Sequence, residues 1–245
     1  MVSLKKMALL TLGFAMLSTD GMAQTTRREY NDIINIHLTP GAPRRHNGCF
    51  TDMGSWMGFT LPEQAQPTTG FCGPYSIYYR HWYARSLVAL QGGTMQERSY
   101  CPGEVRMALT RDGATIQESL QFVDARTALL TIDNPSKRQL VFGADSVSRK
   151  MQLSVENGTV LIACHGGERV MLTFPEPVRV AKAGHNYVAT VPEGMAHLTA
   201  AISIVTQDTE ASVQQVHTAS LLANPEASLK ANEARWNGYL RKVIR

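Results

Sequence analysis

The residues best suited to chemistry lie in segment 50–63, which reads FTDMGSWMGFTLPE. It combines two carboxylates, Asp52 and Glu63, with the aromatic side chains Trp56 and Phe59. Carbohydrate sites use such parts, because aromatic faces pack on sugar C–H groups and carboxylates accept hydrogen bonds from hydroxyl groups. A glycosidase also needs two carboxylates flanking the bond, about 5–5.5 Å or about 6.5–9.5 Å apart. The structural alternative stays open, with Trp56 and Phe59 as core anchors and Asp52 as a turn residue.

A second candidate is the aromatic segment 75–83, YSIYYRHWY, in which Trp82 is a further candidate for substrate binding. The rings could form a platform for a sugar. Alternating large side chains also suit an ordinary β-strand, in which Ile77, Tyr79 and His81 would share one face. We favour the strand, and we expect His81 to be a hydrogen-bonded structural histidine rather than a ligand or base.

Several kinds of site are excluded by missing motifs. The sequence has no G-x-S-x-G, no H-E-x-x-H, no phosphate-binding loop and no G-x-G-x-x-G. His165-Gly166-Gly167 is more typical of a hairpin turn than of an oxyanion loop. The four cysteines lack C-x-x-C spacing, so we expect no metal site and no cofactor. Cys49 and Cys72 are the first pair to test for a disulfide, with inert buried thiols as the equal alternative.

Composition indicates one ordinary soluble domain. The chain has 245 residues with 24 Lys+Arg and 20 Asp+Glu, a formal net charge of +4, which is too small to indicate a nucleic-acid partner. Hydrophobic residues make up 44% and charged residues 18%, a globular balance. Four cysteines in a chain of this length do not make a disulfide scaffold.

The first 23 residues have the pattern of an export signal. Lys5 and Lys6 precede an apolar run at 7–17, and small residues follow at Gly21 and Ala23. This pattern predicts a signal peptide cleaved after Ala23 and a protein exported to a bacterial periplasm. The run is shorter than the roughly 20 apolar residues of a membrane span. The first cysteine, Cys49, lies too far downstream for a lipid anchor, so we expect no membrane anchor after cleavage.

Residues 24–206 are predicted to form an all-β domain. Segment 24–96 is rich in glycine, proline and aromatic residues and has no sustained period, whereas a period of two dominates residues 104–205. Arg111-Asp112-Gly113 and Asn157-Gly158 are turn signals between such runs. Many short strands without intervening helices predict a large antiparallel β-sandwich. The predicted strands are Val105–Leu109, Ile116–Phe122 (with Glu118 on its apolar face), Ala128–Ile132, Leu140–Phe142, Met151–Val155, Val160–Ala163, Val170–Phe174, Tyr187–Val191 and Leu198–Val205.

Residues 207–245 are predicted to be helical. Asp208 or Thr209 would cap a first helix to about Leu222, with Val213, Val216 and Leu221 as its apolar positions. A second helix begins at Asn224-Pro225-Glu226 and places Leu229, Trp236 and Leu240 toward one face. The sequence stops in a basic turn without a glycine cap, so the helix looks cut short. Trp236 and Tyr239 are therefore candidates for docking on a further domain.

Ordered motifs along the chain resemble the N-terminal domain of glycoside hydrolase family 63, with bacterial periplasmic glucosidases as the nearest type. The resemblance runs from about Asn35 to Arg245, and it departs at Ser55 and Met57, where alanine and histidine are more usual. The motifs that carry it are Thr39–Pro43, Phe50–Gly58, Leu61-Pro62-Glu63, Gly70-Phe71, Leu120–Phe122, Arg126–Leu130 and Ala234–Lys242.

The resemblance implies a super-sandwich that precedes a catalytic (α/α)₆ barrel, with the last helix as the linker into it. The family's reaction is inverting hydrolysis of an α-glucosidic bond by an Asp acid and a Glu base, both in the barrel. No position here matches their motifs, so we assign no catalytic residue. The expected function is to brace a barrel, which acts in cis on an α-glucoside oligosaccharide. The alternatives are a stand-alone carbohydrate-binding module and an envelope interaction protein.

Overall fold

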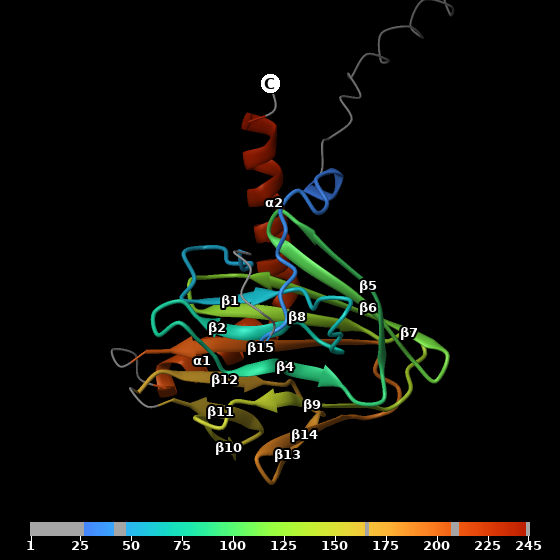
Figure 1. Ribbon diagram of the computed structural model, residues 1–245, viewed down its shortest axis with the longest axis vertical. Helices are drawn as coiled ribbons and strands as arrows, with labels where there is room; N and C mark the ends of the chain where they lie inside the picture. The colour runs from blue at the N-terminus through green and yellow to red at the C-terminus, as the bar shows by residue number, and fades with distance from the viewer. Residues whose placement is uncertain (1–26, 42–47, 165–166, 207–210, 244–245) are drawn as a thin grey trace, which may run out of the picture.

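The computed structural model describes residues 27–41, 48–164, 167–206 and 211–243. Fifteen strands form two sheets that pack face to face, and two helices follow them (Figure 1), which confirms the predicted all-β class and the sandwich. The elements are η1 Arg27–Glu29, β1 Met57–Thr60, β2 Cys72–Ser76, β3 His81–Trp82, β4 Ala84–Leu90, β5 Thr94–Cys101, β6 Glu104–Arg111, β7 Ala114–Phe122, β8 Thr127–Asp133, β9 Leu140–Val147, β10 Gln152–Glu156, β11 Thr159–Ala163, β12 Arg169–Thr173, β13 Arg179–Ala183, β14 Asn186–Val191, β15 His197–Val205, α1 Ala211–Ala223 and α2 Pro225–Val243.

The eight-stranded sheet has the order β10-β11-β12-β15-β8-β7-β6-β5, and all its described pairs are antiparallel. Its two predicted tight hairpins are confirmed. Asn157 and Gly158 have φ of 49° and 75°, and Asp112 and Gly113 have φ of 51° and 76°. Such two-residue turns need positive φ at both positions, which asparagine, aspartate and glycine tolerate best.

The seven-stranded sheet has the order β1-β2-β4-β9-β14-β13, with β3 added beside β2, and β2 pairs with β4 in parallel. Strands β1 to β4 and the start of β5 lie in segment 24–96, which the sequence marked as irregular. Their burial explains why they were missed. All of β1 and nearly all of β2 and β4 is buried, so these strands lack the polar positions that create a period of two.

The predicted single strand at 75–83 is wrong. Strand β2 ends at Ser76, residues 77–80 turn, and β3 pairs back so that Trp82 lies opposite Tyr75. Arg80 takes a φ of 54° in this turn. Ile77, Tyr79 and His81 therefore do not share one strand face. The turn instead exposes Tyr78 and Tyr79.

The core lies between the sheets and follows the alternation of the strands. On β7, for example, Ile116, Leu120 and Phe122 are all at most 1% exposed and point inward. Glu118 shares that inward face and is 2% exposed, lying opposite Met107 and Ile132 on the neighbouring strands. A carboxyl group thus occupies an apolar core position.

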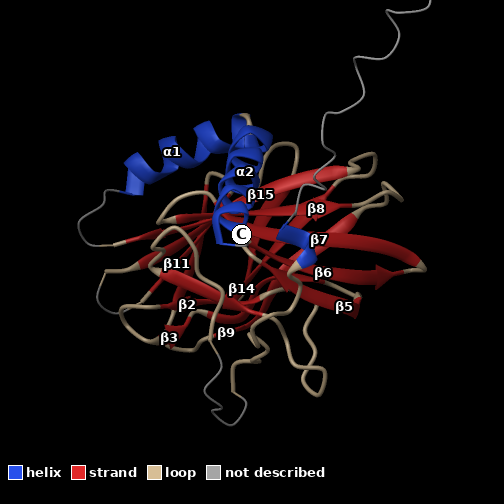
Figure 2. Ribbon diagram, turned by 90° about the horizontal axis from the view of Figure 1, so that it is seen from above, coloured by secondary structure: helices blue, strands red, loops and turns tan. Residues whose placement is uncertain are grey.

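Both helices pack on the outer face of the eight-stranded sheet, α1 against β15 and α2 against β7, and Figure 2 shows them on the same side of the molecule. The predicted apolar face of α1 is wrong, because Val213 and Val216 are 59% and 71% exposed while Gln214 and Thr218 are buried. The sheet explains this reversal. Its outer face presents hydroxyl groups here, and α1 turns matching polar side chains toward them. The expected caps Asp208 and Thr209 lie outside the described residues, as do residues 1–23 and the turn at His165-Gly166.

All four cysteines are unpaired, so the structure contains no Cys49–Cys72 disulfide. Burial raises the pKa of Cys72 to about 12 and also raises that of Cys49, which fits the alternative of inert thiols. Within the described part of the chain, no helix is both long enough and apolar enough to cross a membrane.

Candidate functional site

The carboxylate of Asp52 connects the sandwich to helix α2. Its Oδ2 accepts a hydrogen bond of 2.7 Å from Trp236 Nε1 and pairs with the guanidinium of Arg235, while Oδ1 accepts one of 2.7 Å from the Met53 backbone N–H. The side chain is only 6% exposed. Both oxygens are therefore engaged, and the carboxylate fastens α2 to the sandwich.

The surrounding contacts fix the middle of α2 on the sandwich. Gly103, with φ +80°, makes room for the indole, because a Cβ there would lie 2.0 Å from Trp236 Cδ1. Asn232 is 5% exposed and donates hydrogen bonds of 3.1 Å to Gly103 O and 3.0 Å to Gln121 Oε1. Together with Asp52, Arg235 and Trp236, these residues form what we call the helix junction. The indole of Trp236, a candidate for docking on a further domain, is thus engaged by the sandwich itself.

A buried ion cluster lies next to the helix junction. Arg27 is 2% exposed and sits 3.1 Å from Glu104 Oε2, which Arg106 contacts at 2.6 Å. Burial alone would raise the pKa of Glu104, but the hydrogen bond and charge of Arg106, with the charge of Arg27, outweigh it and lower that pKa. The Arg27 backbone N–H also bonds Asn237 Oδ1 at 2.9 Å. The N-terminal turn η1, strand β6 and α2 are therefore held together.

Next to this cluster, a groove of about 430 Å³ runs between α2 and the outer face of β6–β8. Arg28, Asp133, Glu226 and Lys230 are among the residues that line it. Its described lining is strongly polar and contains no aromatic ring. It therefore lacks the flat apolar surface on which a sugar ring packs.

The aromatic candidates divide into core and surface. Phe59 is 1% exposed and is a core anchor, packed against Phe122 with ring centroids 6.0 Å apart. Trp56 is 41% exposed, and its ring lies 6.1 Å from that of Tyr78. Tyr78 and Tyr79 are 65% and 37% exposed. We call Trp56, Tyr78 and Tyr79 the aromatic surface.

Glu63 and Trp82 lie in other surroundings. Glu63 is half-buried, and its backbone N–H donates a hydrogen bond of 2.9 Å to Thr39 Oγ1. Burial and the charge of Arg98 lower the pKa of His37. The carboxylates of Asp32 and Glu63 oppose this by favouring the charged imidazolium. Trp82 is half-buried against Tyr75, with centroids 5.0 Å apart. Asp52 and Glu63 thus have different partners, since Asp52 holds α2 and Glu63 lies beside His37.

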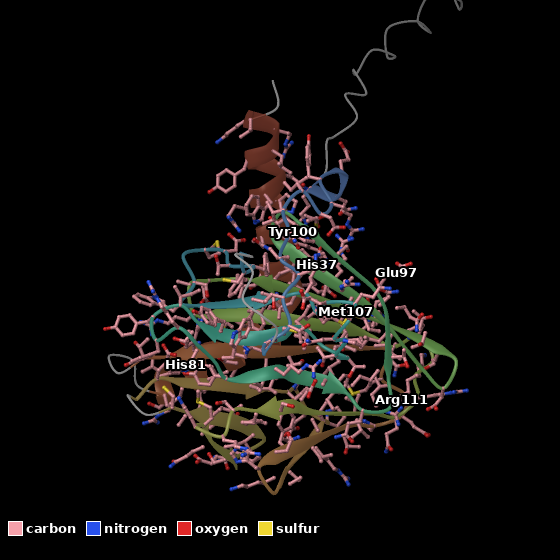
Figure 3. The ribbon with its side chains drawn as sticks, viewed as in Figure 1. His37, His81, Glu97, Tyr100, Met107 and Arg111 are labelled. Atoms are coloured by element: carbon pink, nitrogen blue, oxygen red, sulfur yellow. The ribbon has the colours of Figure 1, made fainter. Side chains whose placement is uncertain are left out.

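One group of described residues has the side chains of a metal site: His81, Cys164 and Glu168. Their ligand atoms all lie within 4.8 Å of one another. Glu168 is 1% exposed, and its Oε1 accepts a 2.7 Å hydrogen bond from Tyr83. Glu168 Oε2 and His81 Nε2 are buried without a hydrogen-bond partner. Burial raises the pKa of the Tyr100 hydroxyl, and the Asp52 carboxylate lies close enough to raise it further, so Tyr100 marks the side of the helix junction. Figure 3 shows His81 far from Tyr100, and the metal-ligating group is therefore separate from the helix junction.

Sequence reasoning missed Arg27, Gly103, Asn232 and Glu168. Only Gly103 had a local signal, since Pro102-Gly103 directly precedes the first predicted strand, Val105–Leu109. The other three are polar residues whose importance comes from partners far away in the sequence.

No protein-family model matches the sequence, and no curated protein matches it. Partly similar solved structures include a heparan sulfate lyase from Pedobacter heparinus (10% identity, TM-score 0.38), a heparinase III (14%, 0.36) and a family 81 glycoside hydrolase from Clostridium thermocellum (9%, 0.36). These alignments cover 69%, 51% and 74% of this chain but only 38%, 24% and 27% of the other proteins. Such low scores establish no common function, and this chain spans less than half the length of each structure.

Proposed function

We propose that this chain is a β-sandwich domain of an exported carbohydrate-active enzyme of the glycoside hydrolase family 63 type, and that it braces a catalytic (α/α)₆ barrel through α2. One observation carries the proposal. Asp52 bonds to Arg235 and Trp236, and these contacts join the two segments, 50–58 and 234–242, on which much of the family resemblance depends. Residues that recur together in a family pattern here make one physical junction.

The geometry of α2 suits a rigid arm. The helix has 19 residues and is anchored at its middle by Asn232 and Trp236. Tyr239 and Val243 beyond the junction are 49% and 80% exposed, and this end of the helix projects past the strands (Figure 1). The turns beyond Trp236 are too few to form a stable isolated helix in water, so the junction supplies the stability that they lack. A domain attached there would be held in a fixed position.

The proposal assigns no hydrolysis to this chain. The acid and base of the family belong to the barrel, and the buried Asp52 carboxylate is engaged by the helix. The substrate, an α-glucoside oligosaccharide, would be reached through the whole enzyme. Export to the periplasm rests on the signal pattern of residues 1–23.

An antibody against the purified chain, applied to periplasmic extracts of the source cells, tests the proposal. We expect it to capture a polypeptide or complex well above 27.0 kDa that hydrolyses α-glucosides with inversion, while the purified chain gives no turnover. Turnover by the purified chain that is lost in Asp52→Ala would contradict the proposal. Capture of the chain with no accompanying glycosidase would also contradict it.

The aromatic surface favours one other function, a carbohydrate-binding module. Three exposed rings lie in succession, with Tyr78 and Tyr79 only 4.8 Å apart. In affinity electrophoresis against soluble glucans, this alternative expects retardation that Trp56→Ala and Tyr78→Ala abolish. Tyr239→Ala, an equally exposed ring on α2, is the matched control. A chain that no glycan retards does not have this function.

A further inference from the structure

We propose that His81, Cys164 and Glu168 bind a transition-metal ion, with Zn²⁺ as the preferred metal and one coordination position left open. The three donors come from three segments that the fold brings together: the start of β3, the residue after β11 and the residue before β12. They offer nitrogen, sulfur and oxygen, which is the mixed set that Zn²⁺ accepts and Mg²⁺ does not.

The distances suit a site of this kind. Ligand atoms within 4.8 Å of one another surround a point that all three can approach. Zinc bonds of about 2.0–2.3 Å place tetrahedral ligand atoms roughly 3.5 Å apart. Binding would therefore draw the ligand atoms closer together by at most about 1.3 Å.

Two buried atoms lack the partner that a metal would supply. Glu168 Oε2 and His81 Nε2 are both shielded from solvent and accept or donate no hydrogen bond. Leaving a carboxylate oxygen unpaired in a residue that is 1% exposed is costly. A bound cation would satisfy both atoms at once, and no other described cation forms an ion pair with Glu168.

Neighbouring contacts already hold the donors in place. Tyr83 donates a 2.7 Å hydrogen bond to Glu168 Oε1, which leaves Oε2 to face the site. The Cys164 backbone N–H donates to the Glu168 carbonyl oxygen at 3.1 Å and fixes the two donors of this loop relative to each other. Metal sites depend on such outer contacts, because these orient the ligands before the ion arrives.

The charges balance when the site is filled. Binding removes the proton from the Cys164 thiol and releases it to solvent, and the resulting thiolate and the Glu168 carboxylate neutralise one Zn²⁺. The neutral imidazole of His81 is the form that ligates zinc, and its Nε2 is the buried nitrogen without a partner. Tyr79 stacks on the His81 ring with centroids 5.9 Å apart, so the site adjoins the aromatic surface.

Cobalt substitution tests the site directly. After chelator treatment, the purified chain should bind one equivalent of Co²⁺ and develop thiolate-to-cobalt charge-transfer absorption that added Zn²⁺ removes. Cys164→Ser should lose this absorption, and Cys49→Ser, which changes another half-buried thiol, should retain it. Tyr83→Phe should weaken Zn²⁺ binding about 10–100-fold, because it frees the Glu168 carboxylate to rotate. No absorption in the parent chain, or unchanged absorption in Cys164→Ser, would overturn the proposal.

A second measurement needs no variant and so does not depend on variants that fold. Iodoacetamide labelling of Cys164, followed by peptide mass spectrometry, should be slowed at least about tenfold by Zn²⁺ and unaffected by Mg²⁺. Labelling of Cys49 in the same sample should not change. Equal labelling of Cys164 with and without Zn²⁺ would refute the site, and it would leave the proposed bracing function untouched.

Discussion

The helix junction and the His81–Cys164–Glu168 group each bury a carboxylate, but they treat it differently. Asp52 is 6% exposed, and both its oxygens have partners within the chain. Glu168 is 1% exposed, and only one of its oxygens has a partner. A fully bonded buried carboxylate secures two parts of a fold, whereas a half-bonded one beside other metal-ligating groups marks a place for a ligand.

Glu118 is a third buried carboxyl group, and neither of its oxygens has a hydrogen-bond partner. Unlike Glu168, it lies opposite the apolar core residues Met107 and Ile132 and belongs to no metal-ligating group among the described residues. Burial raises its pKa from 4.5 to about 8, so it is protonated near neutral pH. An unpaired carboxyl group of this kind needs a proton rather than a metal.

The largest expected effect is the pH dependence caused by Glu118. The contribution of Glu118 to stability is complete below pH 4.5. It is lost as the pH rises to about 8, because in that window Glu118 ionises only in the unfolded state. By 1.36 kcal/mol per pKa unit the loss is about 5 kcal/mol. Urea unfolding from pH 5 to 8 should show this slope in the parent and in Glu97→Gln, an exposed control, but not in Glu118→Gln. A parent chain without the slope contradicts a protonated Glu118.

Breaking the buried ion cluster should cost nearly as much. Glu104→Ala leaves the buried Arg27 charge with only the Glu233 carboxylate, 4.0 Å from its Nε, and should lower the free energy of unfolding by about 3–5 kcal/mol. Because the Glu104 pKa is lowered, its contribution is complete above the unfolded-state pKa and is lost as the pH falls, opposite to Glu118. Glu226→Ala, which removes an exposed ion pair with Lys230, should cost less than about 0.5 kcal/mol. Similar losses in the two variants, measured by urea titration at pH 7, would be evidence against the cluster.

Zinc should distinguish Glu168 from Glu118. At a free Zn²⁺ concentration a hundred times Kd, the ion should stabilise the folded chain by about 2.7 kcal/mol. Thermal unfolding should show this gain in the parent and in Glu118→Gln, and little of it in Glu168→Gln. A gain of the same size in Glu168→Gln would mean that the ion binds elsewhere.

The smallest effect concerns the helix junction. Asp52→Ala removes the bonds to Arg235 and Trp236 and should cost about 2 kcal/mol, the usual scale for hydrogen bonds to a charged group. Trp236 fluorescence should shift to longer wavelength, and amide exchange in α2 should accelerate. Asp112→Asn removes the charge of a carboxylate that is 71% exposed and keeps a residue that tolerates the positive φ of its turn, so it should change neither signal. Unaltered exchange in Asp52→Ala would mean that Asp52 does not anchor the helix.

The parts of the fold that the sequence predicted are those with local signals. Strands that alternate between core and solvent were visible, and the turn at Asn157-Gly158 followed from the conformational freedom of its two residues. Strands covered on both faces had no such alternation, so β1, β2 and β4 were missed. The buried face of α1 was wrong because Gln214 and Thr218 match hydroxyl groups that only the folded sheet presents.

The site was less predictable because its partners are distant in sequence. Asp52 was singled out, but its contacts with α2 span more than 180 positions. We expected no metal site because the sequence has no short cysteine motif. That criterion cannot detect His81 and Cys164, which are far apart in the sequence and adjacent only in the fold. The chemistry of these residues depends on the pairing of the sheets rather than on spacing along the chain.

The polar attachment of α1 has a consequence for local unfolding. The helix is fastened by Gln214 to Thr127 and by Thr218 to Ser203, and its valines already face solvent. Its detachment would expose little new apolar surface, so it would add little to the heat capacity or to the denaturant dependence of unfolding. Native-state hydrogen exchange should therefore reveal α1 as an independent opening unit whose exchange is nearly insensitive to low urea, while the amides of β15 exchange only by global unfolding.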